Sequence, residues 1–248
     1  MIGPSPADID RATIVAWPAA VTEERNGWIY LAAGGVTGRV NAAWPLAWHG
    51  DNLDAAIDDV EAWYAARNLP ARFKITDGAC APEGLPERLA QRGYACVMPT
   101  LVMTANVRAA AASGDVELYD TLPAAFDAVI RETSKDDAEY DERLSIALRA
   151  PQPAAFAVIE RDGRAAAIGM CAAAGNLAGI FLMRTAPEAR RQGLARLIFR
   201  ALMTRCAAWE AQTVFLQVDD HNASAIALYE SEGFTRLTTY SFWRKPAG

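Results

Sequence analysis

Residues 190–195 read RRQGLA and residues 216–234 read LQVDDHNASAIALYESEGF, and these two stretches decide the predicted fold. The first follows an apolar run at residues 179–184. It leads into a segment with apolar residues at positions 194, 197, 198, 201 and 202, the spacing of an amphipathic helix. The second passes from a strand pattern into a helix that ends at Gly233. Two successive strand–loop–helix units indicate an α/β fold.

The rest of the C-terminal half has the pattern of a mixed sheet. We expect helices over residues 122–133, 139–148 and 223–231, and one that begins near Arg190 or Arg191. We expect strands over residues 154–159, 165–173, 179–184, 213–218 and 238–243, the first two joined by a turn at residues 161–163. The hairpin implies an antiparallel part of the sheet, and the later crossovers imply a parallel part.

The N-terminal half has a shortened version of this pattern. We expect a hairpin of strands 28–32 and 36–42 around Gly34 and Gly35, helices over residues 53–66 and 85–91, and strands over residues 72–75 and 95–103. LAQRGY at residues 89–94 parallels YESEGF at residues 229–234, since each ends a helix at a glycine before an aromatic residue. We interpret this as an internal duplication, with domains at residues 1–107 and 115–248 and a linker at residues 108–114.

The composition argues against several classes of protein. Hydrophobic residues make up 52% of the chain and charged residues 22%, an ordinary balance for a globular protein. There is no apolar run of about 18 residues and no signal-like N-terminus, so we expect no membrane span and a cytoplasmic protein. The net charge of −6 argues against nucleic-acid binding. The four cysteines form no CxxC pair and only two histidines are present, so we expect no metal site.

One basic cluster stands out from this acidic background: Arg190, Arg191, Arg196, Arg200 and Arg205. Its first part lies at a helix start, where unpaired backbone N–H groups and the positive end of the helix dipole favour phosphate. Gly193 and Ala195 let a ligand approach the backbone closely. The alternative is a solvated basic helix start without a ligand. Neither GxxxxGK[ST] nor GxGxxG occurs, so ATP hydrolysis and dinucleotide hydride transfer lose support.

The second stretch carries two further candidate residues. Asn222 is placed to cap the helix that follows it, and Tyr229 lies two helical turns later on the same face. A tyrosine there can donate a proton to a thiolate leaving group. Its alternative role is that of a buried aromatic residue whose hydroxyl bonds a backbone carbonyl.

Together the two stretches resemble the motifs of the GNAT superfamily of acyl-CoA-dependent N-acyltransferases. The resemblance covers residues 116–244 in element order, with both motifs at the expected separation. The segment GWIYLAAGGVTGRVNAAWPL lies ahead of that region. This order looks like that of a tandem subset of the superfamily, in which a degenerate domain precedes the active one. The resemblance implies two GNAT-like domains in tandem, each a mixed parallel and antiparallel sheet flanked by helices.

The resemblance also implies a role for individual residues. Residues 190–195 would hold the coenzyme A pyrophosphate, and strand residues 182–185 would offer backbone groups to the pantetheine arm and splay from strand 213–218. Asn222 would bond the pantetheine or a bridging water, and Tyr229 would be the general acid toward the thiolate. The complete implied set is Leu182, Met183, Arg184, Thr185, Arg190, Arg191, Gln192, Gly193, Leu194, Ala195, Asn222, Ala225 and Tyr229.

The general base is the gap in this assignment. Many relatives place a carboxylate on the strand before the phosphate loop, whereas residues 179–184 read GIFLMR. Asp219, Asp220 and His221 end the neighbouring strand and are the candidates, their alternative role being loop solvation and helix capping. Cys171 is disfavoured as an acyl carrier because no histidine lies near it in sequence.

The N-terminal half lacks these parts. Leu89 and Pro82 stand where the second half has Tyr229 and Asn222, and residues 45–52 contain no arginine–glycine loop. We therefore expect a structural role in which this half packs on the active one and walls the acceptor pocket. Trp44 and Trp48 are candidates to line that pocket, although a core position is the alternative.

The leading hypothesis is an N-acetyltransferase that moves the acetyl group of acetyl-CoA to the amine of a small or amino-acid-like acceptor. Direct attack in a ternary complex follows from the resemblance, and a monomer or homodimer is expected. The alternatives are an acyl-CoA-binding sensor without turnover and a nucleotide-binding module that uses the same basic helix start.

Overall fold

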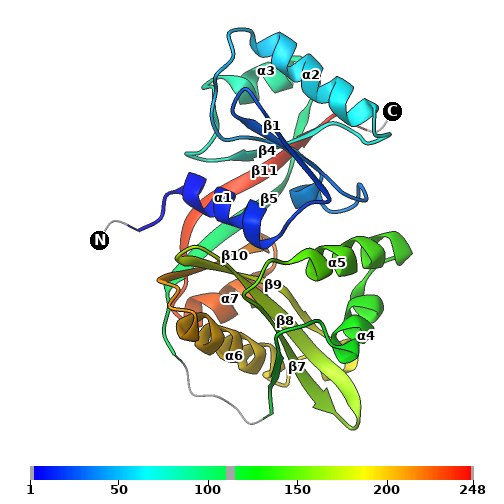
Figure 1. Cartoon of the computed structure of the whole chain (residues 1–248), viewed down its shortest axis with the longest axis vertical. Helices are drawn as coiled ribbons and strands as arrows, with labels where there is room; N and C mark the ends of the chain where they lie inside the picture. The colour runs from blue at the N-terminus through cyan, green and yellow to red at the C-terminus, as the bar shows by residue number, and fades with distance from the viewer. Residues whose placement is uncertain (1–2, 110–114, 247–248) are drawn as a thin grey trace.

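A single sheet of 11 strands runs through the computed structural model, which describes residues 3–109 and 115–246. The strand order is β1-β2-β3-β4-β11-β5-β10-β9-β8-β7-β6. Figure 1 shows α2 and α3 at one end of the molecule, α6 and α7 toward the other, and α4 and α5 beside β7 and β8. The predicted α/β class and mixed sheet are confirmed, since β9 pairs with β10 in parallel and β7, β8 and β9 are antiparallel.

The elements of the N-terminal half are α1 (Pro6–Ala16), β1 (Val21–Arg25), β2 (Trp28–Ala32), β3 (Ala43–Pro45), α2 (Leu53–Ala65), β4 (Arg72–Thr76), α3 (Leu85–Gln91) and β5 (Ala95–Asn106). Those of the C-terminal half are β6 (Glu117–Tyr119), α4 (Ala124–Thr133), α5 (Asp137–Arg149), β7 (Ala154–Arg161), β8 (Arg164–Ala174), β9 (Leu177–Thr185), α6 (Leu194–Ala208), β10 (Thr213–Asp219), α7 (Ala223–Ser231) and β11 (Thr235–Arg244). Short 3-10 turns lie at Gly38–Val40 and Pro187–Ala189.

The predicted hairpin of residues 28–32 and 36–42 is wrong. β2 instead pairs with β1, through a turn at Asn26 and Gly27, and with β3. Residues 34–41 form a loop because the Asn41 amide oxygen accepts from the backbone of Ala33 and Gly35 at 2.8 and 2.9 Å. A side chain that satisfies these two amides replaces the strand ladder.

The predicted start of the long helix at Arg190 or Arg191 is also wrong, because α6 begins at Leu194. Arg191 and Gly193 have φ angles of +62° and +78°, which no right-handed helix accommodates. The helix α1 escaped prediction although Ser5 and Asp8 form a capping box ahead of it.

The two halves exchange their last strands. β11 lies between β4 and β5, and β5 lies between β11 and β10, so each half completes the sheet of the other. In Figure 1 these two strands, red and green, run side by side through the middle of the molecule. The division into domains at residues 107 and 115 stays a prediction, and residues 110–114 of the predicted linker lie outside the described residues.

Three apolar cores pack against this sheet. One joins α1, α4 and α5 with strands of both halves, a second lies under α6 and α7, and a third lies under α2 and α3. A fully buried ion pair fixes α1 to β4, since the Lys74 ammonium lies 2.7 Å from the Asp10 carboxylate and 2.6 Å from the Thr76 hydroxyl. Within the described part of the chain, no helix is long and apolar enough to cross a bilayer.

Candidate active site

The two strands at the centre of the C-terminal half diverge. β9 and β10 pair only through residues 177–179 and 213–215. The pairing of β9 with β8 shifts register after Ile168, and Leu182 has a φ of +51°, which marks a bulge. Residues 180–185 of β9 therefore have no ladder partner in β10, which is the splay that the resemblance implies.

The start of α6 faces this opening without a cap. Gly193 precedes the helix, and no side chain accepts from its first amides. In the described chain, no backbone carbonyl accepts from the amides of residues 191–195. Such amides are normally satisfied by a cap, by water or by a bound ligand.

A cavity of about 820 Å³ lies between the end of β9, the 190–195 loop and the start of α7. Eleven of the thirteen predicted cofactor-binding residues line it: Met183, Arg184, Thr185, Arg190, Arg191, Gly193, Leu194, Ala195, Asn222, Ala225 and Tyr229. Leu182 does not, because it packs against the core under α4 and α5. Gln192 does not either, since its exposed side chain points back to the Glu188 carbonyl at 3.4 Å.

Asn222 and Tyr229 occupy the far wall of this cavity. The Asn222 side chain caps α7 by accepting from the amide of Ala225 at 3.2 Å, as predicted. The Tyr229 ring packs 5.5 Å from that of Phe199 and is 7% exposed. Burial raises the pKa of Tyr229 to about 12, so its phenol is protonated at neutral pH. No described residue accepts a hydrogen bond from this hydroxyl, which disagrees with the alternative role of a carbonyl-bonded core tyrosine.

Only part of the predicted basic cluster is free to meet an anion. Arg196 and Arg200 share the Glu232 carboxylate at 3.2 and 2.9 Å, an acid that lies far along the sequence. Arg205 pairs with Asp120 at 3.1 Å. Arg190 and Arg191 are exposed at the mouth of the cavity, and neither forms an ion pair with another described residue.

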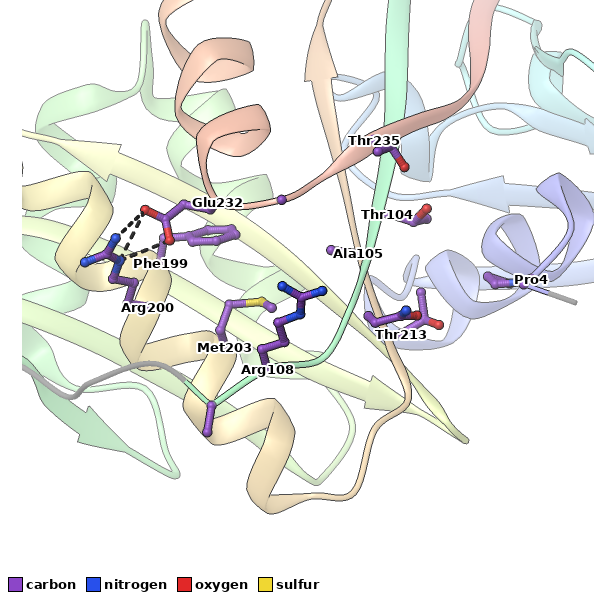
Figure 2. A pocket seen from close by; sticks show the side chains of 14 residues that line it. Pro4, Thr104, Ala105, Arg108, Phe199, Arg200, Met203, Thr213, Glu232 and Thr235 are labelled. Carbon is purple, nitrogen blue, oxygen red and sulfur yellow. Dashed lines mark hydrogen bonds and ion pairs between the residues drawn. The ribbon is translucent and has the colours of Figure 1, made fainter. Parts of the chain in front are cut away.

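A second cavity, of about 410 Å³, lies farther along α6, between this helix, the end of β5 and the start of β11. Figure 2 shows Met203, Phe199 and Arg108 along it, with the Arg200–Glu232 ion pair at its edge. No predicted site residue lines this cavity. It therefore lies apart from the predicted site.

The comparison with protein families decides the identity of the chain. A family model described as "Probable histone acetyltransferase Rv0428c C-terminal" matches residues 7–242, nearly the whole chain. The protein belongs to this acetyltransferase family. It is 26% identical over 242 residues to the uncharacterized N-acetyltransferase YobR of Bacillus subtilis, which covers 94% of this chain and 96% of that protein.

Solved structures agree with this fold. A GCN5-related N-acetyltransferase from Kribbella flavida superposes with a TM-score of 0.73 at 16% identity, over 98% of this chain and 96% of that one. A tandem GNAT protein from the clavulanic acid biosynthesis pathway gives a TM-score of 0.62 at 15% identity, over 99% and 91%. The resemblance to the GNAT superfamily is confirmed, and the chain is an acyltransferase of that superfamily.

None of the three predicted base candidates of the acetyltransferase lines the 820 Å³ cavity. Asp219 is exposed at the end of β10 and lines a different cavity, of about 680 Å³. The His221 side chain is 85% exposed and lies 3.4 Å from Asp220, and neither residue lines either cavity. Glu139 lines the 680 Å³ cavity beside Asp219 and was not predicted, because only tertiary packing brings the first turn of α5 to that place.

Cys171 is unsuited to carry an acyl group in this acetyltransferase. Its thiol is fully buried beside Cys206, and burial raises the pKa of the thiol. Only the thiolate is a useful nucleophile. Cys171 therefore packs as a small apolar side chain, as the sequence indicates.

The 34–41 loop of the N-terminal half contacts α5 of the C-terminal half. The buried Glu142 carboxylate of α5 accepts from the amides of Val36 and Thr37 and from the Asn41 side chain, the first at 3.1 Å and the last at 2.8 Å. This loop forms one wall of the 680 Å³ cavity. Trp44 and Trp48 do not line it, because Trp44 is buried under the Lys74 ammonium and Trp48 packs on Trp28.

Proposed function

We propose that this acetyltransferase moves the acetyl group of acetyl-CoA to the amine of a small, amino-acid-like acceptor by direct attack in a ternary complex. The observation that carries the proposal is the uncapped start of α6, which opens into a cavity shared with the free edge of β9. Anions bind at such helix starts through backbone N–H groups and the helix dipole.

The residues present fit the donor. The amides of residues 191–195 and the Arg190 and Arg191 side chains would hold the diphosphate. The edge of residues 183–185 that faces away from β8, and that β10 leaves unpaired, would pair with the pantetheine arm. A Cβ placed on Gly193 would meet no protein atom within 4 Å, so the space beside it is open. Asn222 and Ala225 line the far wall, along the path toward Tyr229.

The chemistry assigned to the chain is acyl transfer between two heteroatoms. The neutral amine nitrogen attacks the thioester carbonyl carbon, and the carbon–sulfur bond then breaks. The Tyr229 phenol gives its proton to the departing thiolate, and its protonated state across the neutral range suits that role. A backbone N–H near Met183, at the bulge, would stabilise the oxyanion.

The base that deprotonates the amine would come from the 680 Å³ cavity, where Asp219 and Glu139 supply the carboxylates. A primary amine is mostly protonated at neutral pH, since its pKa is about 10. A carboxylate reaching it through water removes this proton before attack. Asp220 and His221 have no such position, because neither residue lines either cavity.

Thiol release from acetyl-CoA over a panel of amines tests the proposal. We expect steady-state release with at least one amino-acid-like amine, and coenzyme A binding by calorimetry. Binding without release under any acceptor would instead favour a sensor. Thermal stabilisation by ATP or NAD, and none by coenzyme A, would favour a nucleotide-binding module.

A further inference from the structure

The 680 Å³ cavity lies where the acceptor has to enter if the donor occupies the cavity described above. Its walls are the 35–39 loop of the N-terminal half, the first turns of α5, the start of β4, the first part of β5, and the ends of β10 and β11. Thr133 and Lys135, two residues apart in the α4–α5 connection, belong to the donor cavity and to this one respectively. The two cavities therefore approach each other beside the β9–β10 opening.

The charge lining this cavity is unusual for the chain. Five cationic side chains line it against two carboxylates, in a protein whose net charge is −6. The cations are Arg39, Arg72, Lys135, Arg143 and Arg244, and the carboxylates are Glu139 and Asp219. A cavity with such a surplus concentrates anions.

Three of the arginines in this region are close enough to repel one another. Arg143 is 14% exposed and pairs with Glu139 at 2.5 Å. Arg184 lies at the junction of the cavities, where burial and the charges of Arg143 and Arg39 lower its pKa to about 10. Its guanidinium bonds only the Thr133 carbonyl, at 3.0 Å, among the described residues.

Arg39 completes this group from the other half of the chain. Its guanidinium donates to the Gln217 side chain at 3.2 Å and forms no ion pair with a described residue. The nearby Glu142 carboxylate does not neutralise it, since both Glu142 oxygens are taken by loop amides and Asn41. Of the three guanidinium groups, only that of Arg143 forms an ion pair with a described carboxylate, that of Glu139. The positive charges of Arg39 and Arg184 have no such partner.

On this basis, and resting on the proposed function, we propose that the acceptor is an amine that also carries a carboxylate, which Arg39 and Arg143 bind. Guanidinium groups bind carboxylates in a fork geometry that also orients the ligand. Arg184 would add positive potential at the junction. Asp219, which lines the same cavity at the end of β10, would take the ammonium end.

Matched acceptors test this proposal in the full-length protein. Amino acids and their C-terminal amides differ only in the carboxylate, so kcat/KM for the two members of each pair isolates its contribution. We expect the acids to react with kcat/KM about 50-fold higher than the amides, the range for a buried charge pair. Equal kcat/KM values would overturn the proposal, and so would a preference for amines that carry a phosphate.

A variant then assigns the binding to Arg39. Arg39→Met should lower kcat/KM for the acids about 50-fold, mainly through KM, and leave the values for the amides unchanged. Arg164→Met, at the exposed β7–β8 turn, is the matched control and should change neither. An unchanged acid-to-amide ratio in Arg39→Met would remove Arg39 from the site.

These results remain separable from a failure of the proposed function. Coenzyme A affinity and the melting temperature of Arg39→Met report whether the protein is folded and its donor site intact. Equal kcat/KM values for the acids and the amides overturn the proposed carboxylate-bearing acceptor and leave the proposed acetyl transfer intact. The absence of thiol release with every acceptor overturns both.

Discussion

In each half of the molecule a strand is followed by a loop and a helix, α2 in the first half and α6 in the second. The two helices differ in how their N-terminal amides are capped. In the N-terminal half, Asn52 caps α2 by accepting from the amide of Ala55 at 3.1 Å. In the C-terminal half, Gly193 stands at the same place before α6 and supplies no side chain. One helix start is capped by a side chain of the protein, and the other has no side-chain cap.

The space around the two loops differs in the same way. A Cβ added to Gly50, ahead of α2, would meet the Trp48 indole at 2.7 Å, and Trp48 itself packs 5.3 Å from Trp28. A Cβ added to Gly193 would meet nothing within 4 Å. A helix dipole alone therefore does not make a binding site. The site also requires that the protein withhold its own caps and side chains.

The strongest test of this contrast is Gly193→Glu, which fills the open helix start with bulk and negative charge. We expect coenzyme A affinity to fall by about 1000-fold or more, because like charges then meet at the diphosphate. Calorimetry measures the loss. Gly163→Glu is the matched control, since Gly163 also has a positive φ, of +72°, and open space but lies at the β7–β8 turn. Equal loss in the two variants would mean that backbone strain, and not the site, is responsible.

Tyr229→Phe removes the proton donor while keeping the ring that packs on Phe199. We expect kcat to fall about 100-fold with coenzyme A affinity nearly unchanged. Tyr64→Phe is the control in the other half, because it removes the hydrogen bond to the Leu31 carbonyl and should leave kcat unchanged. An unaltered kcat in Tyr229→Phe would show that Tyr229 is not the general acid.

The pH dependence of the same step follows from the pKa of Tyr229. Its phenol is the active form when protonated, and burial raises its pKa to about 12, so raising the pH to about 10 should not deplete it. The kcat profile at saturating acetyl-CoA should therefore show no falling limb below about pH 10. A limb at lower pH that disappears in Tyr229→Phe would contradict the assignment.

Glu142→Ala tests the contact between the halves. Removing a buried carboxylate that holds two loop amides and Asn41 should lower the free energy of unfolding by about 2–3 kcal/mol. It should also raise KM for the acceptor without changing coenzyme A affinity, because the loop lines the 680 Å³ cavity and not the 820 Å³ one. Denaturant unfolding and kinetics measure the two effects. Asp141→Ala, its exposed neighbour, should do neither.

The smallest expected effect concerns the capped helix. Asn52→Ala should lower stability by about 1 kcal/mol through the lost cap and leave both kinetics and coenzyme A binding unchanged. Denaturant unfolding and thiol release measure these quantities. A change in coenzyme A affinity would mean that the N-terminal helix start takes part in binding after all.

The sequence predicted those parts whose cause is local. The periodic stretches around α3 and α7 have the predicted bounds, and the two motifs correspond to the loop and helix that border one cavity. The strand predicted at residues 36–42 was wrong because the Asn41 side chain bonds the backbone there. The predicted start of α6 was wrong because Arg191 has a left-handed backbone conformation. Glu139, Arg39 and the strand exchange escaped prediction, since they depend on contacts between segments roughly a hundred residues apart.

The interleaving of β5 and β11 has a consequence for how the chain is made. As the protein emerges from the ribosome, β4 lacks its β11 neighbour until residues 235–244 arrive, so we expect the first half to keep an exposed strand edge until then. A fragment of residues 115–248 would in turn leave a strand-wide gap between β10 and β11. Each half thus depends on the last strand of the other, and we expect the sheet to close only after β11 has been made.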